Sequence, residues 1–142
     1  MTFRPRVCAA IIRNNKILMV FHDHGDRSFW TLPGGAVEEG ETFEEAVVRE
    51  VNEEVKLNCN VIRLLFEDSY EYGPNHCYLV EVNNEEEAEL GEDPELQEDK
   101  QVLKGIGWFA FEEKKNDIQI CKVIKNLYKE EVILYSYEDR RV

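Results

Sequence analysis

The sequence predicts an α/β domain in which a mixed β-sheet lies between helices. Short apolar segments separated by turn residues lie on both sides of one helical segment in the first half of the chain. A second helical segment follows the last predicted strand. The chain has 142 residues, which is enough for one domain with a hydrophobic core and too few for two. We therefore expect a single domain over residues 1–142.

The N-terminal part predicts a β-hairpin followed by a glycine turn. Val7 to Ile12 and Ile17 to Phe21 are apolar, and Asn14-Asn15 between them is a turn signal. After a polar loop, Trp30 to Leu32 predicts a short strand, which runs into Pro33-Gly34-Gly35. Glycines in such a turn can take positive φ and let the backbone approach a ligand.

The first helix is predicted from its capping residues. Thr42 and Glu45 form a Ser/Thr-x-x-Glu capping box, in which each residue satisfies a backbone amide of the other. An apolar periodicity follows directly. The helix is therefore expected to begin at Thr42 and to end at about Val55.

Three glutamates of this helix lie on its apolar side. At about 100° per residue, Glu50, Glu53 and Glu54 fall on the arc that carries Phe43 and Val47. Carboxylates at the edge of a core repel one another and lose hydration, so they need a cation. Mg²⁺ fits this need, because it binds a few carboxylates, keeps waters and shares its coordination sphere with substrate phosphates. The alternative is a Glu-rich surface helix with i,i+4 pairs, and spacing alone leaves both interpretations open.

The second half of the chain predicts three strands and an acidic loop. Cys59 to Phe66 and Cys77 to Val82 are strands, joined by an aromatic loop over 67–74. The mostly acidic run from Asn83 to Lys100 contains glycine and proline and is predicted to be a loop. Leu103 to Phe111 is the last strand.

A closing helix is predicted from Asp117 to about Leu134. Its apolar residues recur at helical spacing and predict one buried stripe. The stripe consists of Ile118, Cys121, Ile124, Leu127 and Tyr128.

Composition excludes several classes of protein. The net charge of −13 and the pI near 4.7 argue against a nucleic-acid polymer as partner, because phosphate backbones are bound through basic surfaces. The N-terminal segment has no long apolar region, so neither a signal peptide nor a membrane span is expected. Cysteines at 8, 59, 77 and 121 show no metal-type spacing, which predicts reduced thiols in a cytoplasmic protein.

The segment from 35 to 57 resembles a known signature, the Nudix box of the Nudix hydrolases. The matching residues are Gly35, Glu41, Arg49, Glu50, Glu53, Glu54 and Leu57, with Leu32-Pro33-Gly34-Gly35 as the lead-in. One position departs from the family, which has glycine where this chain has Lys56. That glycine ends the helix in a left-handed conformation, so the departure concerns the helix exit and not the carboxylates.

The resemblance implies an α/β/α Nudix sandwich and a role for each box residue. Such enzymes hydrolyse a nucleoside diphosphate linked to another group X, by attack of water on phosphorus. Glu50, Glu53 and Glu54 would bind Mg²⁺, with Mn²⁺ as a possible substitute, and the Gly35 carbonyl would add a ligand. Arg49 would orient the carboxylates. Glu50, Glu53 and Arg49 are therefore the expected catalytic residues of the box.

The general base is placed by the family either in the box or on a distal loop. Glu98, in the acidic loop, is the distal candidate, with Glu95 behind it. The alternative for both residues is a solvated acidic loop.

Several residues outside the box are candidates for contacts with the substrate. Arg27 and Arg6 are candidates for phosphate, and Trp30, Tyr70 or Tyr72 for stacking on a base. For each single residue, an ordinary role as a surface cation or a partly buried aromatic is favoured. His22 and His24 are a metal pair by residue type, but their separation from the box favours solvent-facing side chains.

The substrate itself is left open by the sequence. Tyr70, Tyr72 and Pro74 all fall where the family separates ADP-ribose from dinucleoside polyphosphates, and oxidised nucleoside triphosphates and nucleotide sugars are further candidates. The expected partner is a small-molecule nucleoside diphosphate derivative. We expect the protein to be a monomer or a homodimer that does not bind a membrane. A nucleotide-binding module with little turnover is the alternative function, motivated by Lys56 and by the undetermined base.

Overall fold

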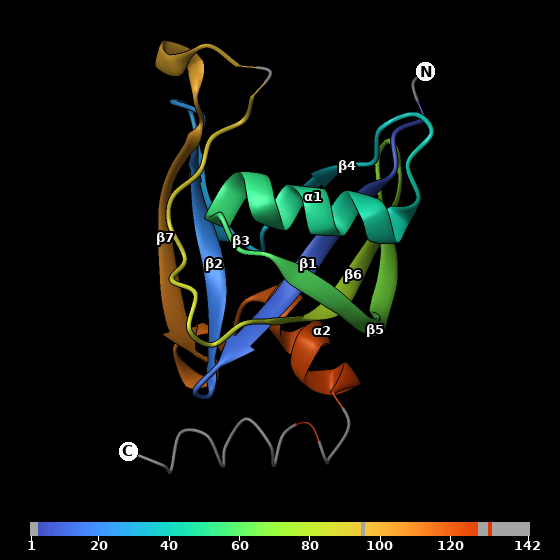
Figure 1. The fold of residues 1–142 in the computed structure, drawn as a ribbon, viewed down its shortest axis with the longest axis vertical. Coiled ribbons are helices and arrows are strands. Elements are labelled where there is room, and N and C mark those ends of the chain that lie inside the picture. The colour runs from blue at the N-terminus through green and yellow to red at the C-terminus, as the bar shows by residue number, and fades with distance from the viewer. Residues whose placement is uncertain (1–2, 95, 128–130, 132–142) are drawn as a thin grey trace.

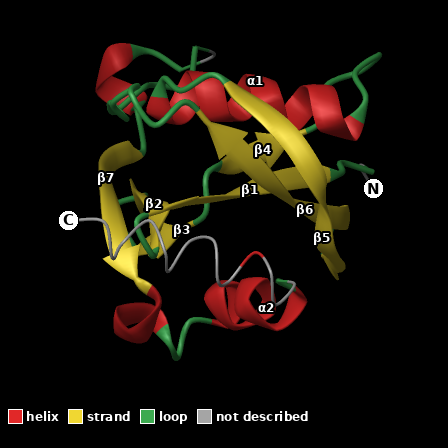
Figure 2. Ribbon diagram, turned by 60° about the horizontal axis from the view of Figure 1, so that its bottom comes forward, coloured by secondary structure: helices red, strands yellow, loops and turns green. Residues whose placement is uncertain are grey.

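A computed structural model describes residues 3–94, 96–127 and 131 and confirms the predicted α/β sandwich (Figure 1). A seven-stranded mixed sheet forms the middle layer. Helix α1 (Phe43–Val55) covers one face of the sheet and helix α2 (Ile118–Asn126) the other (Figure 2). Buried apolar side chains fill the two interfaces as two separate clusters.

The sheet has the strand order β3-β2-β1-β6-β5, with β4 paired to β1 and β7 paired to β2. The strands are β1 (Arg6–Arg13), β2 (Lys16–Asp23), β3 (Ser28–Thr31), β4 (Gly34–Ala36), β5 (Cys59–Tyr70), β6 (Gly73–Val82) and β7 (Leu103–Ala110). Two short 3₁₀ helices, η1 (Glu98–Lys100) and η2 (Phe111–Lys114), flank β7. None of the helices in these described residues is long and apolar enough to cross a bilayer.

Strand β1 lies at the centre and makes the sheet mixed. It pairs antiparallel with β2 and β4 and parallel with β6. The predicted hairpin of β1 and β2 is confirmed, and both of its turn residues, Asn14 and Asn15, have positive φ (51° and 60°). This is the type I′ geometry, whose twist matches that of the flanking strands. Val7, Ala9 and Ile11 of β1 pack in the α1 cluster, and the residues between them pack in the α2 cluster.

Helix α1 begins and ends as its local sequence dictates. The Thr42 hydroxyl accepts from the Glu45 amide (3.0 Å), and the Glu45 carboxylate accepts from the Thr42 amide (2.8 Å), so the capping box is confirmed. At the other end Lys56 has φ 57° and ψ 33°, and its amide donates to the Asn52 carbonyl (3.1 Å). Lys56 therefore adopts the left-handed conformation that glycine usually provides, and the helix exit is preserved.

Replacing Lys56 by glycine is expected to stabilise the fold. A residue with a Cβ is strained in the left-handed region by roughly 1–2 kcal/mol, and the extra chain entropy of glycine offsets about half of this gain. We expect the free energy of unfolding, measured by urea denaturation, to rise by up to about 1 kcal/mol. Lys125→Gly, in the last turn of α2, is the control and should lose up to about 1 kcal/mol. Equal losses in both variants would contradict the strain argument.

The connection between β5 and β6 was predicted wrongly. The expected aromatic loop over 67–74 is instead a continuation of both strands, and only Glu71 and Tyr72 form the turn. Polar cross-strand contacts extend the ladder here, because His76 pairs with Glu67 (2.8 Å) and the Asn75 amide donates to Asp68 (3.1 Å). Polar residues at the edge of a sheet were mistaken for loop residues.

The predicted stripe of the closing helix was also wrong. Asp117 caps α2 by accepting from the Ile120 amide (3.1 Å), as expected, but the buried residues are Ile120 and Val123. Ile118 is 73% exposed and Ile124 is 43% exposed. The apolar residues occur on two faces of the helix, and periodicity alone did not decide which face packs. Helix α2 ends at Asn126, short of the expected end near Leu134, because Leu127 has an extended backbone (φ −77°, ψ 138°). Tyr128 lies outside the described residues.

Candidate metal and nucleotide site

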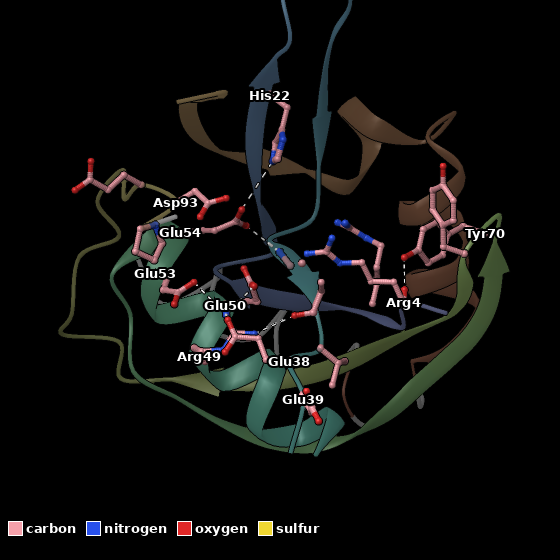
Figure 3. Close-up of a pocket in the computed structure, with 18 residues that line it drawn as sticks. Arg4, His22, Glu38, Glu39, Arg49, Glu50, Glu53, Glu54, Tyr70 and Asp93 are labelled. Atoms are coloured by element: carbon pink, nitrogen blue, oxygen red, sulfur yellow. Dashed lines mark hydrogen bonds and ion pairs between the residues drawn. The ribbon is translucent and has the colours of Figure 1, made fainter. Parts of the chain in front are cut away.

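A cavity of about 680 Å³ opens along the second half of α1 (Figure 3). One side of it is acidic and is formed by Glu50, Glu53 and Glu54 of α1 together with Glu92 and Asp93 of the loop after β6. Arg4 and Tyr70 lie at the opposite end (Figure 3), and Arg6 and Tyr72 also line the cavity. The helix, the start of β1, the β5–β6 turn and the acidic loop all contribute, so the cavity exists only in the complete fold.

Arg49 connects the loop before α1 to the carboxylates of the helix. Its Nε and Nη2 donate to the two oxygens of Glu41 (2.7 and 3.0 Å), and Nη2 also donates to the Ala36 carbonyl (3.0 Å). Its Nη1 donates to Glu50 (2.9 Å) and Glu53 (3.2 Å). The bidentate bond from Arg49 holds the pKa of Glu41 below its ordinary value. This geometry suits a residue that orients carboxylates, with Glu41 as its anchor.

Glu54 forms no ion pair with an arginine or lysine of the described residues, and the charge of Arg6 acts on it only as a smaller effect. Its side chain is only 12% exposed, and one carboxylate oxygen accepts from the Gly34 amide (2.9 Å). The other oxygen is 3.9 Å from Nε2 of His22. Burial, with the nearby charge of Glu50 as a smaller cause, raises the pKa of Glu54 to about 8. Burial also raises the pKa of Glu50, against the opposing effect of Arg49.

Gly34 and Gly35, which precede the helix, lie where a side chain would clash with its neighbours. A Cβ on Gly34 would lie 2.1 Å from the Val7 carbonyl oxygen, so only glycine allows β4 to pair this closely with β1. A Cβ on Gly35 would lie 2.6 Å from the Glu50 carboxyl group. Any side chain at position 35 would therefore displace Glu50 from the cavity wall.

The donor set fits a hard divalent cation. Among the residues that the structure describes, no three His, Cys, Asp or Glu side chains converge on one point as a ready-made metal site. The reason is visible in their partners, because Glu50 and Glu53 turn toward Arg49 while Glu54 turns toward the Gly34 amide. All the donors are nonetheless carboxylate oxygens, the ligand type that Mg²⁺ prefers, and burial disfavours the charged form of Glu54 in the absence of a cation.

Of the candidate residues outside the box, some line the cavity and others lie elsewhere. Tyr72 lines the cavity, as do Arg6 and Tyr70. Arg27 instead lies over the Phe29 ring (5.2 Å), away from the cavity lining. Trp30 packs against Phe21 and Phe109 (5.1 and 4.9 Å between ring centroids) in the cluster on the α2 side of the sheet. A stacking role for Trp30 in this cavity therefore has no support from its position.

The distal loop supplies different acids from the predicted ones. Glu98 is exposed in η1 and is not among the residues lining the cavity, whereas Glu92 and Asp93 are. Glu95 lies outside the described residues. Loop residues follow no periodicity, so the sequence carried no signal that separates Asp93 from its acidic neighbours.

His22 was expected to face solvent, and that expectation is wrong. Its side chain is 17% exposed and lies in the cavity wall beside Glu54. Strand alternation was the available signal, because His22 continues the face of β2 that carries the buried residues Leu18 and Val20.

Comparison with known proteins places this geometry in a family. The chain matches the NUDIX domain over residues 2–129. It is 29% identical over 109 residues to the NAD-capped RNA hydrolase NudC of Photorhabdus laumondii, a match that covers 77% of this chain and 40% of that protein. The MutT NUDIX hydrolase from Burkholderia pseudomallei is similar in structure, with a TM-score of 0.63 at 27% identity over 77% of this chain and 84% of that chain.

A second solved structure has a similar fold. The ADP-ribose pyrophosphatase from Streptococcus suis 89-1591 superposes with a TM-score of 0.63 at 20% identity, over 89% of this chain and 94% of that chain. The chain spans less than half the length of the NudC proteins that it matches. Because the domain match nevertheless covers most of the chain, the chain belongs to the NUDIX domain family.

Proposed function

We propose that the chain is a Mg²⁺-dependent hydrolase that cleaves a nucleoside diphosphate linked to a group X, by attack of water on phosphorus. One observation carries the proposal. Glu50 and Glu54 are nearly buried in the wall of a cavity large enough for a nucleotide, and the single guanidinium of Arg49 reaches only Glu50 of the two. The remaining charge calls for a divalent ion, and the ion's open positions suit phosphate oxygens.

The residues of α1 have two different roles, metal binding and orientation of the metal ligands. Glu50, Glu53 and Glu54 would hold Mg²⁺, or Mn²⁺ in its place, with the Gly35 carbonyl as a further ligand. A bound Mg²⁺ neutralises pyrophosphate oxygens and lowers the pKa of the attacking water. Arg49 keeps Glu50 and Glu53 in fixed orientations through its bonds to both, and Glu41 keeps Arg49 in place.

The basic end of the cavity suits the rest of the substrate. Arg4 and Arg6 both line it, and neither forms an ion pair with a carboxylate of the described part of the chain. In a chain with a net charge of −13, such arginines are available for a phosphate. Tyr72 beside them is 44% exposed and offers a ring for a base.

The water-activating carboxylate is proposed to be Asp93. It lines the cavity, and Figure 3 shows its side chain directed toward Glu54. Glu98, the candidate from the sequence, lies farther along the same loop in η1. A general base must come within hydrogen-bonding reach of the water, and a residue of the cavity wall meets that requirement with the smaller movement.

The substrate class is tested by a screen for turnover with Mg²⁺. It includes nucleoside triphosphates, oxidised triphosphates, nucleotide sugars, ADP-ribose, dinucleoside polyphosphates and, because of the name of the NudC relative, NAD-capped RNA. We expect a small-molecule diphosphate to be cleaved, since the acidic chain repels an RNA backbone. Nucleotide binding without any turnover would favour the binding module instead.

Divalent metal is expected to stabilise the folded protein through α1. An ion that binds only the folded form adds RT ln(1 + [L]/Kd) to the free energy of unfolding, or about 2.7 kcal/mol at a hundredfold excess over Kd. The melting temperature should therefore rise with Mg²⁺ or Mn²⁺, and it should rise less in Glu50→Gln, which keeps the shape of the side chain but loses the charge. Equal shifts in the two proteins, measured by calorimetry, would show that the ion binds elsewhere.

A further inference from the structure

The loop after β6 is bound to the C-terminal end of α1 through its backbone. We call residues 88–93 the strap; Figure 1 shows this yellow segment beside the end of α1. The Glu89 amide donates to the Val55 carbonyl (2.9 Å), and the Gly91 amide donates to the Glu54 carbonyl (2.8 Å). The last carbonyls of a helix have no partner within the helix, so the strap satisfies two of them. Ala88 also packs against the core cluster under α1.

Gly91 allows the strap to approach this closely. A Cβ on Gly91 would lie 1.7 Å from the Glu53 carbonyl oxygen and 2.8 Å from the Glu53 carbonyl carbon. Both atoms belong to the helix backbone, which cannot rotate away as a side chain can. Any other residue at this position would therefore push the strap and the helix apart.

Gln101 holds the strap from the other side. Its Oε1 accepts from the Asp93 amide (2.7 Å), and its Nε2 donates to the Asp93 carbonyl (2.8 Å). The same Nε2 donates to the Leu96 carbonyl (2.8 Å). A single side-chain amide thus satisfies both backbone groups of Asp93, in the way that a neighbouring strand would.

Asp93 is held between the contacts of Gly91 and those of Gln101, and its carboxylate enters the acidic side of the cavity. Asp93 lies beside Glu54 there (Figure 3), where like charges repel. Burial is the main cause of the raised pKa of Glu53 and of Glu54, and the charge of Asp93 adds a smaller contribution. A loop held only by its ends would relax away from such repulsion. The backbone contacts of Gly91 and Gln101 oppose that movement.

We propose that Gly91 and Gln101 are positioning residues that hold the Asp93 carboxylate in the cavity, where it activates the attacking water. The proposal rests on the hydrolase function argued above. It adds that the end of the metal-binding helix, through the Glu54 carbonyl, sets the place of the base. Helix α1 and the strap come from distant segments of the chain. These hydrogen bonds and the glycine at position 91 keep them in a fixed relative position.

The test is a set of double-mutant cycles with Asp93→Asn. Gln101→Ala and Gly91→Ala should each lower kcat by about 10²-fold, the usual effect of a misplacement of about 1 Å, with a small change in KM. In the Asp93→Asn background neither substitution should lower kcat further, because the residue through which they act is already disabled. Gln97→Ala and Gly105→Ala are matched controls, since Gln97 makes no cap bond and a Cβ on Gly105 would meet Phe21 at an ordinary 3.5 Å.

A second readout follows the strap itself. Amide hydrogen exchange should show the Asp93 amide protected in the wild type and exposed in Gln101→Ala, and the Gly91 amide exposed in Gly91→Ala. Losses of kcat that add to that of Asp93→Asn would overturn the positioning role, and so would full activity with an exposed Asp93 amide. A wild type that cleaves no substrate of the screen would instead overturn the proposed function, and this role with it.

Discussion

Replacing Glu54 by glutamine is expected to lower kcat by about 10²-fold or more, with little change in fold. Glutamine keeps the size of the side chain and its bond from the Gly34 amide, but it removes the charge that would hold the metal. Because the ion supplies most of the charge stabilisation at the phosphoryl group, the loss should appear in turnover. Glu53→Gln should behave alike. Steady-state kinetics at several Mg²⁺ concentrations measure both effects.

The control is Glu44→Gln, which removes one charge from the exposed first turn of the same helix. It should leave kcat unchanged, because Glu44 does not line the cavity. Near-full activity of both Glu53→Gln and Glu54→Gln at saturating Mg²⁺ would contradict the assignment of the ligands.

Replacing Asp93 by asparagine is expected to lower kcat by roughly 10² to 10⁴-fold, the usual contribution of a general base. The midpoint of a Mg²⁺ titration should stay unchanged, because the proposed role concerns the water and not the ion. Glu98→Gln removes the acid that the sequence singled out, and it should have only a small effect, since Glu98 is exposed outside the cavity lining.

Two other outcomes would relocate the base. A large loss in Glu98→Gln with a silent Asp93→Asn would assign the role to Glu98 and require the loop to close over the cavity. If both variants are silent and Glu50→Gln abolishes turnover without weakening metal binding, the base lies within α1.

The fold and the helical half of the site were predictable because they are locally encoded. The capping box at Thr42, the Asn14-Asn15 turn and the spacing of the carboxylates depend on residues within a few positions of one another. The departure at Lys56 was correctly confined to the helix exit, since the left-handed geometry is kept by a lysine.

The loop half of the site was not predictable, because tertiary contacts determine it. The place of Asp93 depends on the approach of Gly91 to α1 and on the bonds from Gln101, and none of these contacts follows a period along the chain. Trp30, a candidate for stacking, packs in the cluster on the α2 side of the sheet, and His22, expected to face solvent, lies in the cavity wall.

The parallel pairing of β1 with β6 has a consequence for how the protein folds. Cys8 pairs with Cys77, and α1 with the whole glycine turn lies in the chain between these partners. Closing so long a loop costs chain entropy before native contacts can compensate for it. Such topologies therefore fold slowly, typically in milliseconds to seconds. The cavity wall combines residues of β1, β4, α1 and the strap, so it is complete only when strands far apart in the sequence have paired. Formation of α1 alone therefore does not create the cavity.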